Sequence, residues 1–148
     1  MTDSPSNDLR LLWAILAPLA GAGLVMATGK RPNVRETVSF LAAVTLFGFV
    51  ASLVPDVLAG RTPRCVVFDL LPGLRVTLRA DSLSMMFAVA ASLLWILTVF
   101  YSAGYMRGLA EHAQTRFNTC FALALFGAIG CAFSDNLLTL YLFYEIVS

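Results

Sequence analysis

Four apolar stretches constrain the fold of this chain more than any other feature of its sequence. They extend from about Leu9 to Thr28, Thr37 to Leu58, Leu83 to Met106 and Phe117 to Phe133. Each falls within the length that a transmembrane helix needs, about 17–25 residues. Backbone polar groups in lipid must be satisfied within the segment, so such stretches cross the membrane as helices. The sequence therefore predicts an all-α membrane protein built as a multi-span helical bundle.

The composition supports an integral membrane protein. Hydrophobic residues make up 59% of the chain and charged residues 13%, whereas soluble domains usually carry about 25% charged residues. The net charge is +1 and the chain has no basic run, so nothing indicates a nucleic-acid partner. The N-terminus is acidic and polar and lacks the positive region of a cleaved signal peptide. We therefore interpret the first stretch as a retained span and expect a multi-pass protein of the cell (inner) membrane.

A fifth apolar segment begins at Asn136 and stops with the chain at Ser148. A helix over these residues would be about 20 Å long, against the roughly 30 Å of the hydrocarbon core. This truncated fifth span would leave a terminal carboxylate inside the hydrocarbon, which is unfavourable. We therefore expect residues 1–148 to form the N-terminal transmembrane part of a larger protein.

The segment between the second and third stretches has a different pattern. From Leu74 to Arg79, apolar and polar residues alternate, which is the period of a half-buried strand. Leu71-Pro72-Gly73 supplies a turn in front of it. The pattern predicts a short β-hairpin between spans 2 and 3. We interpret this hairpin as a structural cap on one membrane face rather than as a ligand site.

Glu145 is an ionisable carboxylate inside the apolar run of the fifth segment. A helix from Asn136 would place it roughly 14 Å deep, near the middle of the bilayer. An acidic side chain at that depth costs about 2.5–3.5 kcal/mol even on insertion scales, and such residues commonly serve ion pathways. Burial favours the neutral carboxyl, and a nearby ammonium favours the ionised one. We predict that Glu145 is a proton relay; the alternative is a neutral, hydrogen-bonded structural glutamate.

Other polar residues have simpler interpretations. Tyr141 and Ser148 lie on the face of Glu145 and could hydrogen-bond it, although packing is the favoured role for Tyr141. Asp81 and Asp135 open helices, where acids cap the N-terminus. The loop residues Arg107, Glu111, His112 and Arg116 are interpreted as solvated charges rather than as an ion entrance.

Small residues form a stripe along the fourth span, at Ala124, Gly127, Ala128, Cys131 and Ala132. Such a stripe lets helix backbones approach closely in lipid. We expect it to pack beside the fifth helix and to shield Glu145 from lipid.

Cofactor and metal chemistry find no support in the sequence. The three cysteines show no CxxC or Cys/His spacing that would indicate zinc or an iron–sulfur cluster. A bis-histidine haem within this chain is excluded because His112 is its one histidine. We predict no cofactor and no metal site.

Three stretches resemble the proton-conducting antiporter-like family of membrane subunits. They are Arg79–Phe87, Tyr101–Phe117 and Phe133–Glu145. The family includes the D-type and A-type subunits of Mrp multisubunit Na⁺/H⁺ antiporters and the antiporter-like subunits of respiratory complex I. The wording Tyr-Met-Arg-Gly-Leu at 105–109 and Phe-Tyr-Glu at 143–145 is most similar to the D-type branch. The resemblance implies that Glu145 is an essential glutamate facing a lysine, which lies outside this chain.

The leading prediction is a subunit of a monovalent cation/proton antiporter, which moves ions without covalent chemistry. Its expected partners are the lipid bilayer, other membrane subunits, H⁺, and Na⁺ or another monovalent cation. One alternative is a proton-pumping subunit of a complex I or membrane-hydrogenase type redox complex. Another is a non-transporting fragment or scaffold. The sequence contains no complete coordination set that would identify the cation.

Overall fold

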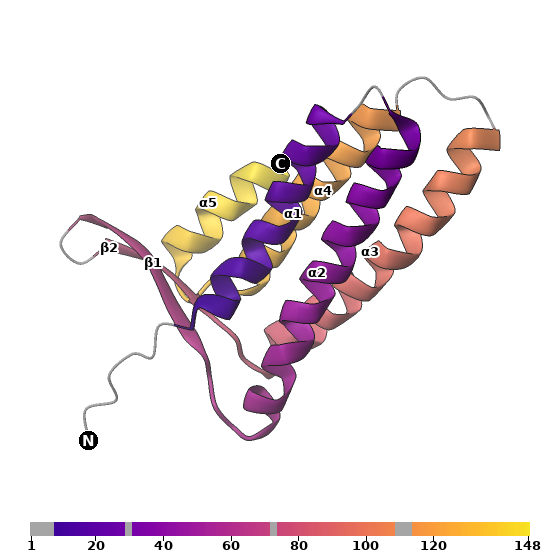
Figure 1. The fold of residues 1–148 in the computed structure, drawn as a ribbon. Coiled ribbons are helices and arrows are strands. Elements are labelled where there is room, and N and C mark those ends of the chain that lie inside the picture. The colour runs from indigo at the N-terminus through magenta and orange to yellow at the C-terminus, as the bar shows by residue number, and fades with distance from the viewer. Residues whose placement is uncertain (1–7, 29–30, 72–73, 109–113) are drawn as a thin grey trace, which may run out of the picture.

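The computed structural model describes residues 8–28, 31–71, 74–108 and 114–148. Five helices and one two-stranded sheet make up this part of the chain (Figure 1). The helices are α1 (Leu9–Ala27), α2 (Pro32–Leu58), α3 (Ser82–Gly108), α4 (Gln114–Ala132) and α5 (Leu137–Val147), and the strands are β1 (Arg64–Leu71) and β2 (Leu74–Arg79). The predicted class, a helical bundle with a hairpin between spans 2 and 3, is confirmed.

Four of the described helices are long and apolar enough to cross a membrane. The spans are Leu9–Ala27, Asn33–Leu58, Ser82–Met106 and Gln114–Ala132. Between 28% and 39% of each span is buried inside the chain. Most of the apolar surface therefore faces outward, as expected for helices surrounded by lipid or by further helices. The helix α5 is apolar but shorter.

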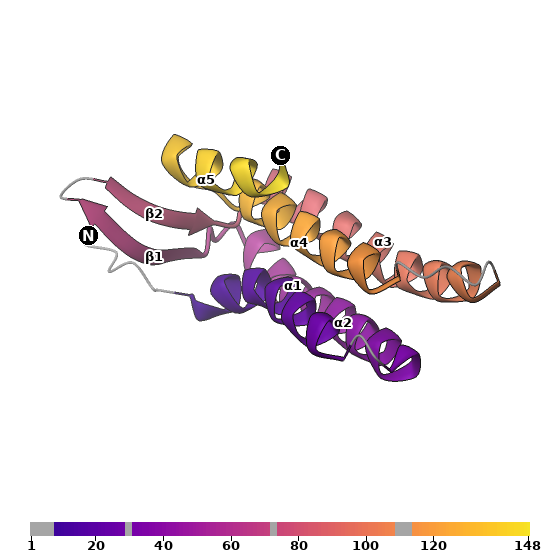
Figure 2. The ribbon, with the colours of Figure 1, turned by 90° about the horizontal axis from the view of Figure 1, so that it is seen from above.

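The bundle is built around α1, which packs against both α2 and α4, while α2 also packs against α3. The helix α5 lies at the edge, beside α4 (Figure 2). The helices α1 and α2 approach each other closely at Gly21, where an added Cβ would lie 2.6 Å from the Cβ of Ala42. Phe133, Leu11 and Leu46 are the largest of the fully buried side chains. These contacts hold α4, and hence α5, in place.

The hairpin is tied to the helices through both of its edges. The strands β1 and β2 pair antiparallel, with Arg64 opposite Arg79 and two irregularities in register along β1. The free edge of β2 is covered by the connection between α4 and α5. There the Arg79 N–H donates to the Phe133 carbonyl at 2.7 Å, and the Asp135 N–H donates to the Thr77 carbonyl at 3.1 Å. An exposed strand edge is thereby removed.

The start of α3 is capped by Asp81, as predicted. The Ser84 N–H donates to Asp81 Oδ1 at 2.8 Å, and the Asp81 N–H donates to Ser84 Oγ at 2.8 Å. This reciprocal arrangement is a capping box. Hydrogen bonding from the Ser84 N–H, assisted by the charge of Arg79, holds the pKa of the Asp81 carboxyl below its usual value.

This cap predicts a dependence of stability on pH. A carboxyl whose pKa is lowered in the folded state stabilises the fold at neutral pH, and loses that effect as the pH falls below about 4. Asp81→Asn keeps a capping side chain but cannot titrate. We expect the melting temperature of the wild type to fall more than that of Asp81→Asn between pH 5 and pH 3, in thermal melts of the detergent-purified protein. Asp69→Asn, on an exposed hairpin position, is the control, and equal falls for Asp81→Asn and wild type would contradict the assignment.

Candidate functional site around Glu145

The helix α5 carries Glu145, and its first turn is fixed to the hairpin. Asn136 caps the helix, since its Oδ1 accepts hydrogen bonds from the N–H and the hydroxyl of Thr139, each at 2.8 Å. The Asn136 amide also donates to the Arg75 carbonyl at 2.7 Å and to Thr77 Oγ1 at 2.9 Å. The Thr77 N–H donates to Thr139 Oγ1 at 3.1 Å. Thr139 is fully buried, so this network forms a closed joint between α5 and β2.

Asp135 has a different role from the one predicted. The helix cap is its neighbour Asn136, and the Asp135 carboxylate instead lies 3.3 Å from Nε of Arg79. Arg79 also contacts Asp81 at 3.3 Å, so one guanidinium joins the starts of α3 and α5. The capping prediction for Asp135 is therefore wrong. The local pattern offered two adjacent caps, and a tertiary contact decided between them.

The other end of α5 packs against α4 through small residues, as the stripe predicted. The ring of Phe143 lies directly over Gly130, where an added Cβ would collide with it. The Val147 side chain occupies the corresponding place over Gly127. Phe143 also meets Phe126 edge to face, with ring centroids 5.4 Å apart. Glycine at 127 and 130 lets the two backbones approach.

Glu145 itself points away from this contact. It follows Phe143 by two residues, which is about 200° around a helix, and it is exposed. The expectation that the stripe on α4 shields Glu145 is therefore wrong. Tyr141 and Ser148, which share its side of α5, are exposed as well. No described residue makes a hydrogen bond or an ion pair with the Glu145 carboxylate.

Two other predicted groups can be placed only in part. Glu111 and His112 lie outside the described residues, as does the side chain of Arg107. Arg116 is exposed, in keeping with a solvated charge. Within the described ranges, no three His, Cys, Asp or Glu side chains come together in a way that could hold a metal ion.

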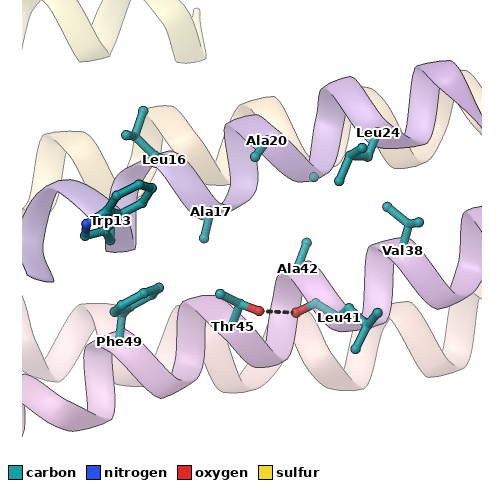
Figure 3. A pocket seen from close by; sticks show the side chains of 11 residues that line it. Trp13, Leu16, Ala17, Ala20, Leu24, Val38, Leu41, Ala42, Thr45 and Phe49 are labelled. Atoms are coloured by element: carbon teal, nitrogen blue, oxygen red, sulfur yellow. Dashed lines mark hydrogen bonds between the residues drawn. The ribbon is translucent and has the colours of Figure 1, made fainter.

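An apolar groove between α1 and α2 is a poor candidate for ion binding. Trp13, Ala17, Leu24 and Phe49 are among the side chains that line it (Figure 3). The Thr45 hydroxyl in its wall donates to the carbonyl of Leu41 at 2.7 Å, within its own helix. With a volume of about 320 Å³ and an apolar lining, the groove offers no charged group to an ion.

The sequence prediction missed Arg35, because it began the second span at about Thr37. The helix α2 begins at Pro32, and Arg35 lies near its start with only 5% of its surface exposed. Pro32 at the first helical position was the available signal, because proline is favoured there.

These elements define a multi-pass α-helical membrane protein with one acidic residue on an open face of its fifth helix. The chain is 27% identical over 150 residues to the "Putative antiporter subunit mnhA2" of Staphylococcus aureus strain MRSA252, and the match covers 95% of this chain. The protein of the same name from strain JH9 is 26% identical over the same share. No protein-family model matches the chain.

Two solved structures share the fold. The membrane-bound sulfane sulfur reductase, an archaeal respiratory membrane complex, matches with a TM-score of 0.77 and 20% identity, over 93% of this chain and 21% of that chain. The Mrp complex from Dietzia sp. DQ12-45-1b matches with a TM-score of 0.74 and 21% identity, over 94% of this chain and 25% of that chain. The predicted resemblance to antiporter-like membrane subunits is thereby confirmed.

The chain spans 18% of the length of the curated relatives named above. Both relatives carry the name mnhA2, and the particular similarity to the D-type branch stays a prediction.

Proposed function

We propose that the chain acts as part of a subunit of a monovalent cation/proton antiporter. The observation that carries this proposal is the similarity to antiporter subunits over 95% of its length. The four apolar spans of the described residues support a place in the membrane. The expected setting is the cell (inner) membrane, beside other membrane subunits.

In this proposal residues 1–148 are the N-terminal transmembrane part of a larger subunit, and Glu145 is a proton relay. The carboxylate lies on the side of α5 opposite the Phe143 contact, where the described part of the chain leaves it exposed. A carboxylate exposed to hydrocarbon is costly. We therefore expect a further helix to cover this face and to bring a cationic group, such as a lysine, to Glu145. Its presence or withdrawal would shift the carboxyl between its charged and neutral forms.

A redox-driven proton pump is the second candidate. It is favoured by the match in fold to a respiratory membrane complex, with a TM-score of 0.77. The same helices could serve either kind of assembly, since the fold alone does not identify the energy source.

Transport in membrane vesicles that contain the complete complex tests the proposal. We expect addition of Na⁺ or another monovalent cation to move protons without any electron donor, measured with a fluorescent pH indicator. Vesicles from cells lacking the complex are the control. Proton movement that requires an electron donor and ignores the cation gradient would favour the redox-driven pump. No proton movement under either condition would favour a scaffold.

A further inference from the structure

A small polar cavity lies between α2, α3 and α4. Its lining residues come from the ends of these helices that lie away from the hairpin, as the ribbon in Figure 1 shows for the helix ends. The polar side chains that line it include Glu36 and Ser39 from α2, Ser102 from α3, and Gln114 and Asn118 from α4. The volume of the cavity is about 10 Å³, which is close to the minimum that one ordered water needs. The cavity is therefore matched to a single water-sized ligand.

Two of the buried polar groups that lack a protein partner among the described residues are relevant here: the hydroxyl of Ser39, which lines the cavity, and Nε of Arg35, which does not line the cavity but whose guanidinium bonds the lining residue Gln114. Arg35 is 5% exposed; its Nη1 donates to Thr115 Oγ1 at 3.1 Å and its Nη2 donates to Gln114 Oε1, but its Nε–H has no acceptor. Ser39, one turn further along α2 and 4% exposed, has an unpaired hydroxyl. Leaving such groups unsatisfied destabilises the fold. Buried polar groups of native proteins usually have a protein or water partner.

The chemistry of this site selects among possible ligands. The guanidinium of Arg35 and the carboxylate of Glu36 belong to adjacent residues and carry opposite charges. A cation attracted by Glu36 would be repelled by Arg35, and an anion attracted by Arg35 would be repelled by Glu36. The size of the cavity excludes an anion as large as phosphate. A bare cation cannot accept the hydrogen bond that Arg35 Nε offers. A neutral molecule that both donates and accepts hydrogen bonds fits the charge, the size and the two unpaired groups.

We propose that this cavity binds one ordered water molecule, which accepts a hydrogen bond from Arg35 Nε and exchanges one with the Ser39 hydroxyl. The water completes a clamp in which Arg35 joins the start of α2 to the start of α4. Ser39 lies two turns inside α2, so this water lies within the bundle. The inference is independent of the proposed transport function.

Replacement of Ser39 tests whether the cavity holds water. With and without a bound water, the melting temperature of the variant is expected to shift in opposite directions relative to a control. In the full-length protein with its partner subunits, we expect Ser39→Ala to melt about 2–4 °C below the control Ser92→Ala, because it removes a hydrogen bond to the water. Ser92 is a buried serine whose hydroxyl donates to the Ala88 carbonyl of its own helix. In a dry cavity, Ser39→Ala would remove an unsatisfied hydroxyl and would melt at or above the control, which would overturn the proposal.

A high-resolution cryo-electron microscopy map of the same assembly gives the direct observation. We expect density for one water within hydrogen-bonding distance of Ser39 Oγ and Arg35 Nε, and its loss in Ser39→Ala. An empty cavity in a map that resolves other buried waters would overturn the proposal whatever the melting temperatures are.

Discussion

Glu145→Gln in the complete complex is expected to abolish cation-coupled proton movement. The amide keeps the size and hydrogen-bonding capacity of the side chain but cannot release a proton. Positioned acid–base groups typically contribute about 10²–10⁴-fold to a rate, so we expect transport to fall by about 100-fold or more. Because the side chain lies away from the contacts of Phe143 and Val147 with α4, assembly and melting temperature should stay close to wild type. The measurement is proton flux in vesicles, normalised to the amount of assembled complex.

Two further variants define what this result means. Glu145→Asp retains a titratable group on a shorter side chain, so partial transport is expected. Asp69→Asn removes an exposed carboxylate on the hairpin and should leave transport unchanged. Full transport by Glu145→Gln would show that the residue is a structural glutamate, while the antiporter function could still stand.

Gly130→Leu is expected to cause the largest loss of stability in the α4–α5 contact. Even a Cβ at this position would collide with the Phe143 ring, so a full side chain must push α5 away from α4. Overpacking of this kind costs about 1–3 kcal/mol. The displacement would also move Glu145, and we expect both a lower melting temperature and reduced transport. Gly48→Leu is a matched control, because that helical glycine has open space around its Cβ position.

A double variant tests whether the loss of stability in Gly130→Leu arises from the contact with Phe143. Phe143→Ala makes room for the new side chain, so Gly130→Leu should cost less in the Phe143→Ala background than in wild type. Equal costs in both backgrounds would place the damage elsewhere than at the Phe143 ring.

The spans and the hairpin could be predicted from the sequence because each rests on a local pattern. Long apolar runs in lipid have one common solution, the helix, and the alternation from Leu74 to Arg79 has the period of a strand. The start of the second span was less accurate, because a charge at Arg35 is typical of a loop residue. Its burial depends on Thr115 and Gln114, which are 80 and 79 residues further along the chain.

The direction in which Glu145 points could not be predicted from a local sequence pattern. The stripe on α4 predicted a close helix contact, and Gly127 of that stripe makes one; Gly130, which the prediction did not include, makes the other. Which face of α5 would meet that stripe depends on the joint of Asn136 and Thr139 with β2, and this joint is tertiary. The role of Asp135 was missed for the same reason, since its partner Arg79 lies on a strand that is distant in sequence.

The covered edge of β2 has a consequence for how the chain tolerates change. The α4–α5 connection is held there by backbone groups, from Arg79 to Phe133 and from Asp135 to Thr77. Substitutions of side chains leave such bonds in place, so the distance from this edge to Glu145 is set by the count of residues between them. One residue inserted in α5 before Glu145 would lengthen that distance by about 1.5 Å and turn the carboxylate by about 100°. Amino-acid identity in this stretch can therefore vary more freely than its length.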